Sequence, residues 1–254
     1  MSLNRNQENH FQKAAHYDLL ANYYKYIDPA MHIAFYQKHL KYMTLAAHSM
    51  RTHMNLPQNG AVHPAKIRFV HGSNDASNVD IYVNGSRILK DFPFKEASTY
   101  LSLPAGKYQV DIYPAGNMVS TVLSRKIIVG QGKNYTFLFS GTGKSLKWLA
   151  LEDEHHVPHG ETKLRFIHLA DDAPAFDIAV KDRDVIFPNI AYRKFTSYLG
   201  LSPMTVDLEA RIAGSKNVVL SIPHVRLEPN KVYSIFFIGS VADGPELEAI
   251  MFEG

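Results

Sequence analysis

The chain has 254 residues, of which 46% are hydrophobic and 20% charged, with a formal net charge of +3 and no cysteine. This composition is typical of globular proteins, and the lack of cysteine excludes disulfides, thiol nucleophiles and thiolate metal sites. Residues 1–56 hold six basic and three acidic residues. So small an excess argues against a nucleic-acid-binding protein, whose basic residues cluster far more densely. No apolar run approaches the ~18 residues of a membrane-spanning helix.

Residues 1–56 are predicted to form a helical hairpin that is divided at Asp28-Pro29. Asp is a favoured N-cap residue, and Pro is favoured at the first helical position. The first helix is expected to pack through a loose apolar face: Phe11, Ala15, Leu19, Tyr23 and Tyr26. The second helix carries a stricter apolar stripe, called the seam below: Ile33, Tyr36, Leu40, Met43, Ala47, Met50 and Met54.

The seam follows alternating steps of three and four residues, the spacing of a coiled-coil interface. Two interpretations remain open. The seam packs inside the hairpin, or it mediates self-association with a second copy of the chain. Because two helices alone bury little surface, the hairpin is expected to dock on the β region or on another subunit.

The rest of the chain consists of two related β units, residues 66–153 and 163–254. "KIRFVHGSNDAS" at Lys66 and "KLRFIHLADDAP" at Lys163 share six of their twelve positions. Each unit contains short alternating runs separated by turn residues, such as Asn84-Gly85 in "DIYVNGSRIL". The fold class predicted is therefore mainly β: two tandem Ig-like antiparallel β-sandwiches after an N-terminal α-helical hairpin.

The repeated Arg-x-x-His-x-x-x-Asp motif supplies the candidate site residues. Strand alternation places Ile67, Phe69 and His71 on one face and Arg68 and Val70 on the other. The histidine is expected to bond to a loop carbonyl or carboxylate, with the following aspartate as the nearest choice, and Arg68 could pair with the carboxylate at position 80 or with its partner strand. Both copies keep the motif although their turns differ, which favours a scaffold over a catalytic centre. The low-ranked binding candidates are Arg68, His71, Asp75, Asp80, Arg165, His168, Asp172 and Asp177.

The β units resemble a bacterial family known only as domain of unknown function 4397. The first copy carries its Arg-x-x-His-x-Ser-x-Asp-Ala motif from Arg68 to Ala76, the Asn84-Gly85 turn and the Pro104-Ala105-Gly106 turn. The second copy keeps Arg165, His168 and Asp172 but lacks both turns. The resemblance implies tandem β-sandwich modules, commonly on bacterial cell surfaces, and it brings no catalytic residues. The helical segment lies outside it.

These patterns predict a non-enzymatic structural or interaction protein of the bacterial envelope or spore surface, self-associating through its helices. The alternative is a glycan- or peptide-binding module that uses loop ends or a sheet edge. No cofactor, metal, nucleic acid or membrane span is expected, while envelope or coat components are candidate partners. Because the N-terminus shows no signal-peptide core, the sequence predicts the cytoplasm. Deposition from there onto a cell or spore surface would agree with the family resemblance.

Overall fold

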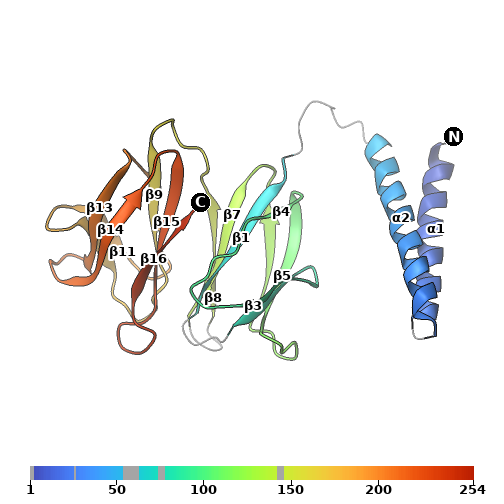
Figure 1. The fold of residues 1–254 in the computed structure, drawn as a ribbon, viewed down its shortest axis with the longest axis horizontal. Helices are drawn as coiled ribbons and strands as arrows, with labels where there is room; N and C mark the ends of the chain where they lie inside the picture. Colours follow the sequence, from blue (N-terminus) through green and yellow to red (C-terminus); the bar gives the residue numbers. More distant parts are fainter. Residues whose placement is uncertain (1–2, 26, 54–62, 74–77, 142–145) are drawn as a thin grey trace. The chain divides into compact units, whose positions relative to one another are not determined.

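The computed structural model describes residues 3–25, 27–53, 63–73, 78–141 and 146–254. Contacts divide the chain into two compact units, Met1–Ala61 and Val62–Gly254. The first unit is the helical hairpin and the second contains all of the strands (Figure 1).

The hairpin consists of α1 (Leu3–Tyr24) and α2 (Pro29–His53). Asp28 caps α2, because its Oδ1 accepts hydrogen bonds from the backbone N–H groups of Ala30 and Met31 at 3.0 and 3.1 Å. The predicted division at Asp28-Pro29 is therefore confirmed.

The two helices pack through small and aromatic residues. Ala14, Ala21 and Ala46 are buried between them. Tyr17 stacks on Phe35 with ring centroids 6.2 Å apart. The small alanine side chains allow the backbones of α1 and α2 to approach closely on this side of the hairpin. The predicted α1 face is wrong: Leu19 and Tyr23 are 70% and 65% exposed and Ala15 is also exposed, while the side chains of Phe11 and Tyr26 lie outside the described residues.

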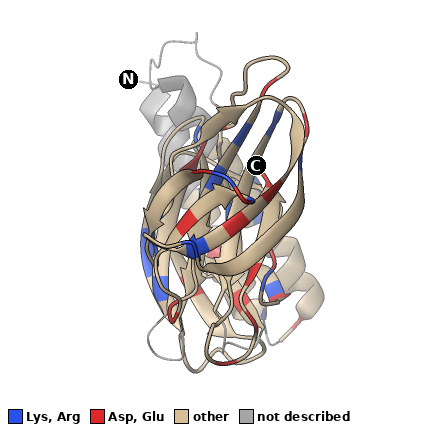
Figure 2. Cartoon of the chain, turned by 90° about the vertical axis from the view of Figure 1, so that its left-hand side faces the viewer, with Lys and Arg blue, Asp and Glu red and all other residues tan. Residues whose placement is uncertain are grey.

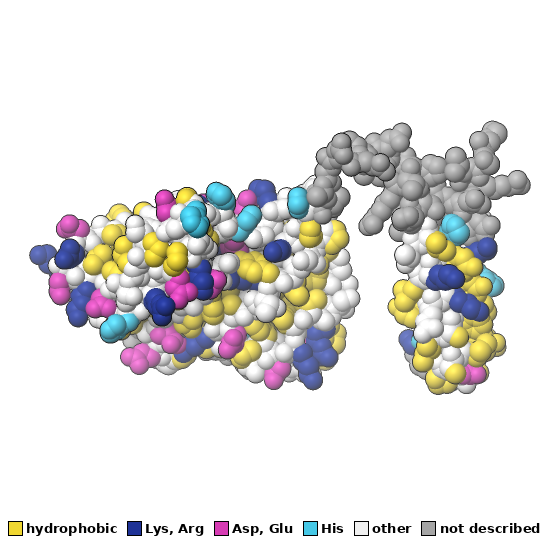
Figure 3. All heavy atoms as spheres, turned by 45° about the horizontal axis from the view of Figure 1, so that its top comes forward, with side chains coloured by type: hydrophobic (Ala, Val, Ile, Leu, Met, Phe, Trp, Pro, Cys, Tyr) yellow, Lys and Arg dark blue, Asp and Glu magenta, His cyan; other side chains and the backbone are white. Residues whose placement is uncertain are grey.

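The seam of α2 does not face α1. Ile33, Tyr36, Leu40 and Met43 are 55%, 47%, 48% and 42% exposed. The interpretation that the seam packs inside the hairpin is therefore wrong for these four residues. The side chains of Ala47, Met50 and Met54 lie outside the described residues. Figure 3 shows hydrophobic side chains along the visible surface of the hairpin.

The described residues of the second unit form sixteen strands in four four-stranded sheets. The first eight are β1 (Ala65–Gly72), β2 (Val79–Val83), β3 (Ser86–Phe92), β4 (Leu101–Leu103), β5 (Gly106–Pro114), β6 (Leu123–Val129), β7 (Asn134–Ser140) and β8 (Lys147–Asp153). The second eight are β9 (Thr162–His168), β10 (Phe176–Val180), β11 (Val185–Ile190), β12 (Leu199–Leu201), β13 (Met204–Ile212), β14 (Val218–Leu227), β15 (Lys231–Ile238) and β16 (Glu248–Glu253).

Each repeat is a sandwich of one outer and one inner sheet. The outer sheets have the orders β3-β2-β5-β6 and β11-β10-β13-β14, and the inner sheets β4-β1-β7-β8 and β12-β9-β15-β16. The predicted fold class is confirmed. Each inner sheet also contains one parallel pair, β1 with β7 and β9 with β15.

The two sandwiches pack through their inner sheets, so the unit is a stack of four layers (Figure 1). The interface between the inner sheets buries Val70, Leu138, Leu151, Ile167, Leu169, Phe236 and Ile238. Strands β1 and β9 are consequently covered on both faces, and almost every residue in them is buried. This double burial places the arginines and histidines of the repeated motif in the interior.

Candidate functional site

Arg68 points from β1 into the interface between the two inner sheets, where it is 3% exposed. Its Nε donates to Thr136 Oγ1 at 2.8 Å, and its Nη1 donates to the backbone carbonyl of Glu253 at 2.6 Å. Its guanidinium carbon lies 4.8 Å from the centre of the Tyr100 ring. The expected pair between Arg68 and Asp80 is wrong, because Arg68 is directed at the other sandwich and Asp80 pairs with Arg87.

Arg165 occupies the equivalent place on β9 and is 2% exposed. Its Nε donates to Ser234 Oγ at 2.9 Å, its Nη1 donates to the carbonyl of Glu152 at 3.1 Å, and its guanidinium lies 4.5 Å from the Tyr198 ring. Each arginine thus bonds to a hydroxyl of its own sandwich and to a backbone carbonyl of the other. The pair fixes the two sandwiches against each other.

Asp153 is the buried carboxylate of this interface. Its Oδ1 forms an ion pair with Arg165 Nη2. Its Oδ2 accepts hydrogen bonds from the Tyr100 hydroxyl at 2.8 Å and from Thr136 Oγ1 at 2.6 Å. Burial, and next the charge of Asp153, raise the pKa of Tyr100 above its ordinary value. We call these residues the polar cluster: Arg68, Tyr100, Thr136, Asp153, Arg165, Tyr198 and Ser234.

The motif histidines face the opposite way, into the two sandwich cores. His71 Nδ1 donates to the carbonyl of Phe92 at 3.2 Å, and its ring lies 4.7 Å from that of Phe139. His168 Nε2 donates to the carbonyl of Pro174 at 3.0 Å. Both histidines are fully buried. His168 therefore bonds to a loop carbonyl, one of the two expected kinds of acceptor, and the expected choice of Asp172 is wrong. The Asp75 proposed for His71 lies outside the described residues.

The free energy of unfolding is expected to fall as the pH decreases from about 6.5 towards 4. Burial lowers the pKa of His71 from 6.5 to about 4, and it lowers the pKa of His168 in the same direction. Between these pH values the unfolded chain binds a proton that the folded chain does not, so stability is lost as the pH falls. The loss from His71 alone is about 3 kcal/mol.

Urea unfolding at pH 7 and pH 4.5 measures this effect. His71→Phe removes the titrating group, so its stability should depend less on pH than that of the wild type. His155→Phe, at an exposed histidine, should leave the dependence unchanged. Equal pH dependence in the wild type and His71→Phe would contradict the assignment.

The remaining motif carboxylates cap loops. Asp80 Oδ1 accepts from the Asp91 N–H at 2.8 Å, and this bond is the main reason that the pKa of Asp80 is lowered. Asp177 likewise accepts from the Asn189 N–H at 2.7 Å. Asp172 accepts a hydrogen bond from Ser240 Oγ at 2.6 Å, whereas His168 Nε2 bonds to the Pro174 carbonyl. The candidate residues are therefore distributed among the interface, the cores and the loops, and they do not form one catalytic constellation.

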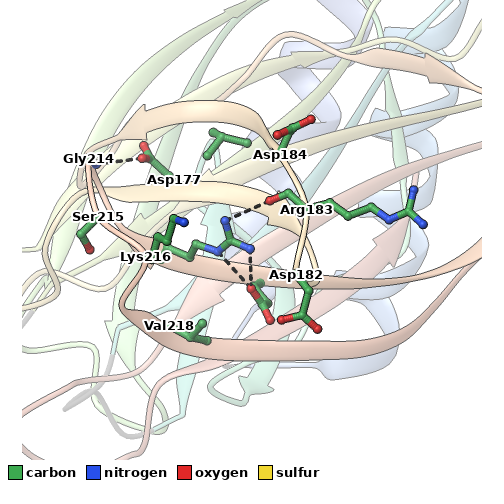
Figure 4. Close-up of a pocket in the computed structure, with 11 residues that line it drawn as sticks. Asp177, Asp182, Arg183, Asp184, Gly214, Ser215, Lys216 and Val218 are labelled. Atoms are coloured by element: carbon green, nitrogen blue, oxygen red, sulfur yellow. Dashed lines mark hydrogen bonds and ion pairs between the residues drawn. The ribbon is translucent and has the colours of Figure 1, made fainter.

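A pocket of about 760 Å³ lies on the outer sheet of the second sandwich. Its most buried charged pair is Arg211 and Glu209, joined by bonds of 3.0 and 2.8 Å from Nε and Nη2 to Oε2. Arg211 Nη1 also donates to the carbonyl of Arg183 (Figure 4). The lining residues are Asp177, Asp182, Arg183, Asp184, Val185, Glu209, Arg211, Gly214, Ser215, Lys216 and Val218. The sequence analysis did not identify this pocket.

Basic and acidic residues are interspersed along the backbone in the view of Figure 2. Among the described residues, no three His, Asp or Glu side chains come together as a metal site. No helix within the described ranges is long and apolar enough to cross a membrane.

The family model "Domain of unknown function (DUF4397)" matches residues 65–179 and again residues 172–253. The chain belongs to this family. The two matches agree with the predicted pair of repeats and leave the helical hairpin outside. Comparison with curated proteins finds no match.

Solved structures give low similarity scores. The C-terminal domain of AlgF from P. aeruginosa is 14% identical, with a TM-score of 0.27, and the match covers 36% of this chain and 99% of that one. The Bacillus anthracis TIE protein is 12% identical, with a TM-score of 0.25 and coverages of 76% and 43%. A candidate cell adhesion protein from Bacteroides eggerthii is 8% identical, with a TM-score of 0.23 and coverages of 78% and 97%. At these scores, the likenesses carry no argument about this chain.

Sequence reasoning missed most of the polar cluster. Thr136 and Ser234 are the polar positions inside the otherwise apolar runs "KNYTFLF" and "KVYSIFF", which was the available signal. Asp153 ends the run "LKWLALED", but nothing in that run distinguishes it from a solvated carboxylate.

Proposed function

We propose that this chain is a non-enzymatic interaction protein that self-associates through the seam of α2. The observation that carries the proposal is the exposure of Ile33, Tyr36, Leu40 and Met43 after the hairpin has packed. A stripe with heptad spacing fits another helix, because side chains at these positions insert between those of a facing helix.

The residues beside the seam favour a second copy of the chain as the occupant. On one side lie Gln37 and Thr44, which carry no charge. On the other side lie His32 and His39, whose Nδ1 atoms bond to the α1 carbonyls of Ala21 at 2.8 Å and Ala14 at 3.0 Å. These four flanking positions carry no acidic or permanently basic residue, although Arg51 stands at the next position in the Gln37-Thr44 series. Like-charge repulsion between two identical seams is therefore confined to the Arg51 end.

The β unit supports a structural role for the remainder of the chain. The arginines and histidines of the repeated motif make buried contacts. Arg68 and Arg165 join the two sandwiches, and His71 and His168 lie in the sandwich cores. We place the protein at the bacterial envelope or spore surface, as the family resemblance implies.

The test is the mass of the full chain in solution. Sedimentation equilibrium over a range of concentrations should give a species of twice 28.6 kDa. A mass of 28.6 kDa at every concentration would reject self-association.

A peptide-binding role is the second candidate, and the charged pocket on the outer sheet favours it over glycan binding. The lining residues include no aromatic ring, whereas Asp182 and Asp184 are exposed at the pocket. The carboxylates Asp177, Asp182, Asp184 and Glu209 outnumber the cations Arg183, Arg211 and Lys216. This excess of carboxylates favours a peptide ligand with a basic side chain.

A fluorescent lysine-rich peptide is expected to bind the full chain, more weakly as salt is added. Replacing both Asp182 and Asp184 with Asn should weaken binding about tenfold, since each rim charge contributes up to about 1 kcal/mol. Anisotropy titration measures this change. Equal affinity in the wild type and the double variant would exclude the pocket as the binding site.

A further inference from the structure

A stack of three rings lies along one edge of the seam. The Tyr36 ring stacks on the rings of His32 and His39, with centroids 6.1 and 6.0 Å apart and an interplanar angle of 22° in each pair. Tyr36 belongs to the seam and is 47% exposed, whereas the two imidazoles are half-buried. The two histidines therefore lie at the boundary between the α1–α2 contact and the surface proposed for self-association.

Hydrogen bonds to α1 determine which nitrogen of each ring can take up a proton. His32 Nδ1 bonds to the carbonyl of Ala21 at 2.8 Å, and His39 Nδ1 bonds to the carbonyl of Ala14 at 3.0 Å. Because a carbonyl only accepts, each Nδ1 carries a hydrogen and Nε2 of the neutral ring carries none. An added proton therefore binds to Nε2, on the side of the ring away from the bonded carbonyl.

The surroundings give the two rings no negative partner. Asp18 is the carboxylate of α1 between the two bonded carbonyls, and no hydrogen bond or ion pair joins it to either ring among the described residues. Asp28 is occupied as the cap of α2. Tyr17 and Tyr24 stack on Phe35. The other basic side chains of these turns add positive charge: Lys13, His16, Lys25, Lys38 and Lys41.

We propose that the edge formed by His32, Tyr36 and His39 is part of the self-association surface, and that two copies associate only while these imidazoles are neutral. This inference rests on the self-association proposed above. A symmetric pair of seams covers this edge on both copies and brings four imidazoles into one interface. Protonation would place positive charges there without counter-ions, which opposes association. Since imidazole takes up a proton between about pH 8 and pH 5, mild acid should separate the two copies.

Sedimentation equilibrium of the full chain at pH 7.5 and pH 5.5 tests this inference. The wild type should have twice 28.6 kDa at pH 7.5, and its dissociation constant should be at least about tenfold higher at pH 5.5. The double variant His32→Asn with His39→Asn keeps a side-chain N–H that can donate to the α1 carbonyl, and it takes up no proton. Its dissociation constant should be the same at both pH values.

His155→Asn with His156→Asn is the matched control, because it removes two exposed histidines outside the hairpin. This variant should dissociate in acid as the wild type does. A second readout needs no variant: dilution calorimetry of the wild type at pH 6, in two buffers of different ionisation enthalpy, should show that dissociation takes up protons.

Three results would overturn the inference while leaving self-association in place. They are an equal dissociation constant of the wild type at both pH values, a pH response that persists in His32→Asn with His39→Asn, and dissociation without proton uptake. The second result would assign the response to other groups such as His71 and His168, which that variant keeps. A wild type of 28.6 kDa at both pH values would reject self-association and this inference with it.

Discussion

Replacing Arg165 with Met is expected to lower the free energy of unfolding by about 3 kcal/mol. The substitution removes the ion pair to Asp153 and leaves a carboxylate of the inter-sandwich interface without its direct counter-charge. Breaking one partner of a buried ion pair typically costs about 3–5 kcal/mol. We expect the low end, because the Tyr100 and Thr136 hydroxyls still donate to Asp153.

Arg68→Met is the matched control, at the equivalent position of the other sandwich. Arg68 has no ion pair with a carboxylate among the described residues, and its Nη2 has no hydrogen-bond partner. Its replacement gives up two hydrogen bonds to neutral groups and also removes a buried unpaired donor, so the expected cost is about 1 kcal/mol. Urea unfolding at pH 7 compares the two variants directly.

The double variant Arg165→Met with Asp153→Leu separates loss of the ion pair from loss of packing. Replacing a whole buried pair by apolar residues is often close to neutral. Asp153→Leu also leaves the Tyr100 and Thr136 hydroxyls without their acceptor, so this variant should recover only part of the stability that Arg165→Met loses. Equal costs for Arg165→Met and Arg68→Met, or no recovery in the double variant, would contradict the role assigned to Asp153.

Local patterns predicted the parts of this structure that depend on neighbouring residues. The two-residue period of a strand correctly placed Phe69 and His71 on one face and Arg68 on the other. The Asn84-Gly85 turn forms as expected, since both residues have positive φ. The repeat of the motif correctly gave two sandwiches.

Local sequence patterns did not predict the contacts between segments that are distant in the chain. The carbonyl that accepts from Arg68 belongs to Glu253, on the last strand of the other sandwich. Its position depends on how two completed sandwiches pack, which no local pattern encodes. The His168–Asp172 prediction failed for a related reason. Closeness in sequence did not determine the acceptor, and His168 Nε2 donates its hydrogen bond to the Pro174 carbonyl.

In the helical hairpin, the apolar pattern of α1 did not predict which face packs against α2. Apolar residues occur on more than one side of each helix, and the sides that pack combine small alanines with stacked aromatic rings. Small residues such as Ala14 and Ala21 are buried against α2, whereas the larger Leu19 remains exposed. The four described residues of the seam remain exposed on α2.

Leu40→Asp is expected to abolish self-association. Leu40 lies in the middle of the described part of the seam and is 48% exposed. A carboxylate there is tolerated in the monomer, because it stays in water, but it would be buried without a partner between two seams. Lys41→Asp is the control, since it places the same carboxylate on the neighbouring exposed residue of α2, outside the seam.

The mass of the full chain, measured with the seam intact and with the seam interrupted, tests self-association most directly. Sedimentation equilibrium should give twice 28.6 kDa for the wild type and for Lys41→Asp, and 28.6 kDa for Leu40→Asp. A wild type that stays at 28.6 kDa, or a Leu40→Asp variant with the same mass as the wild type, would contradict it.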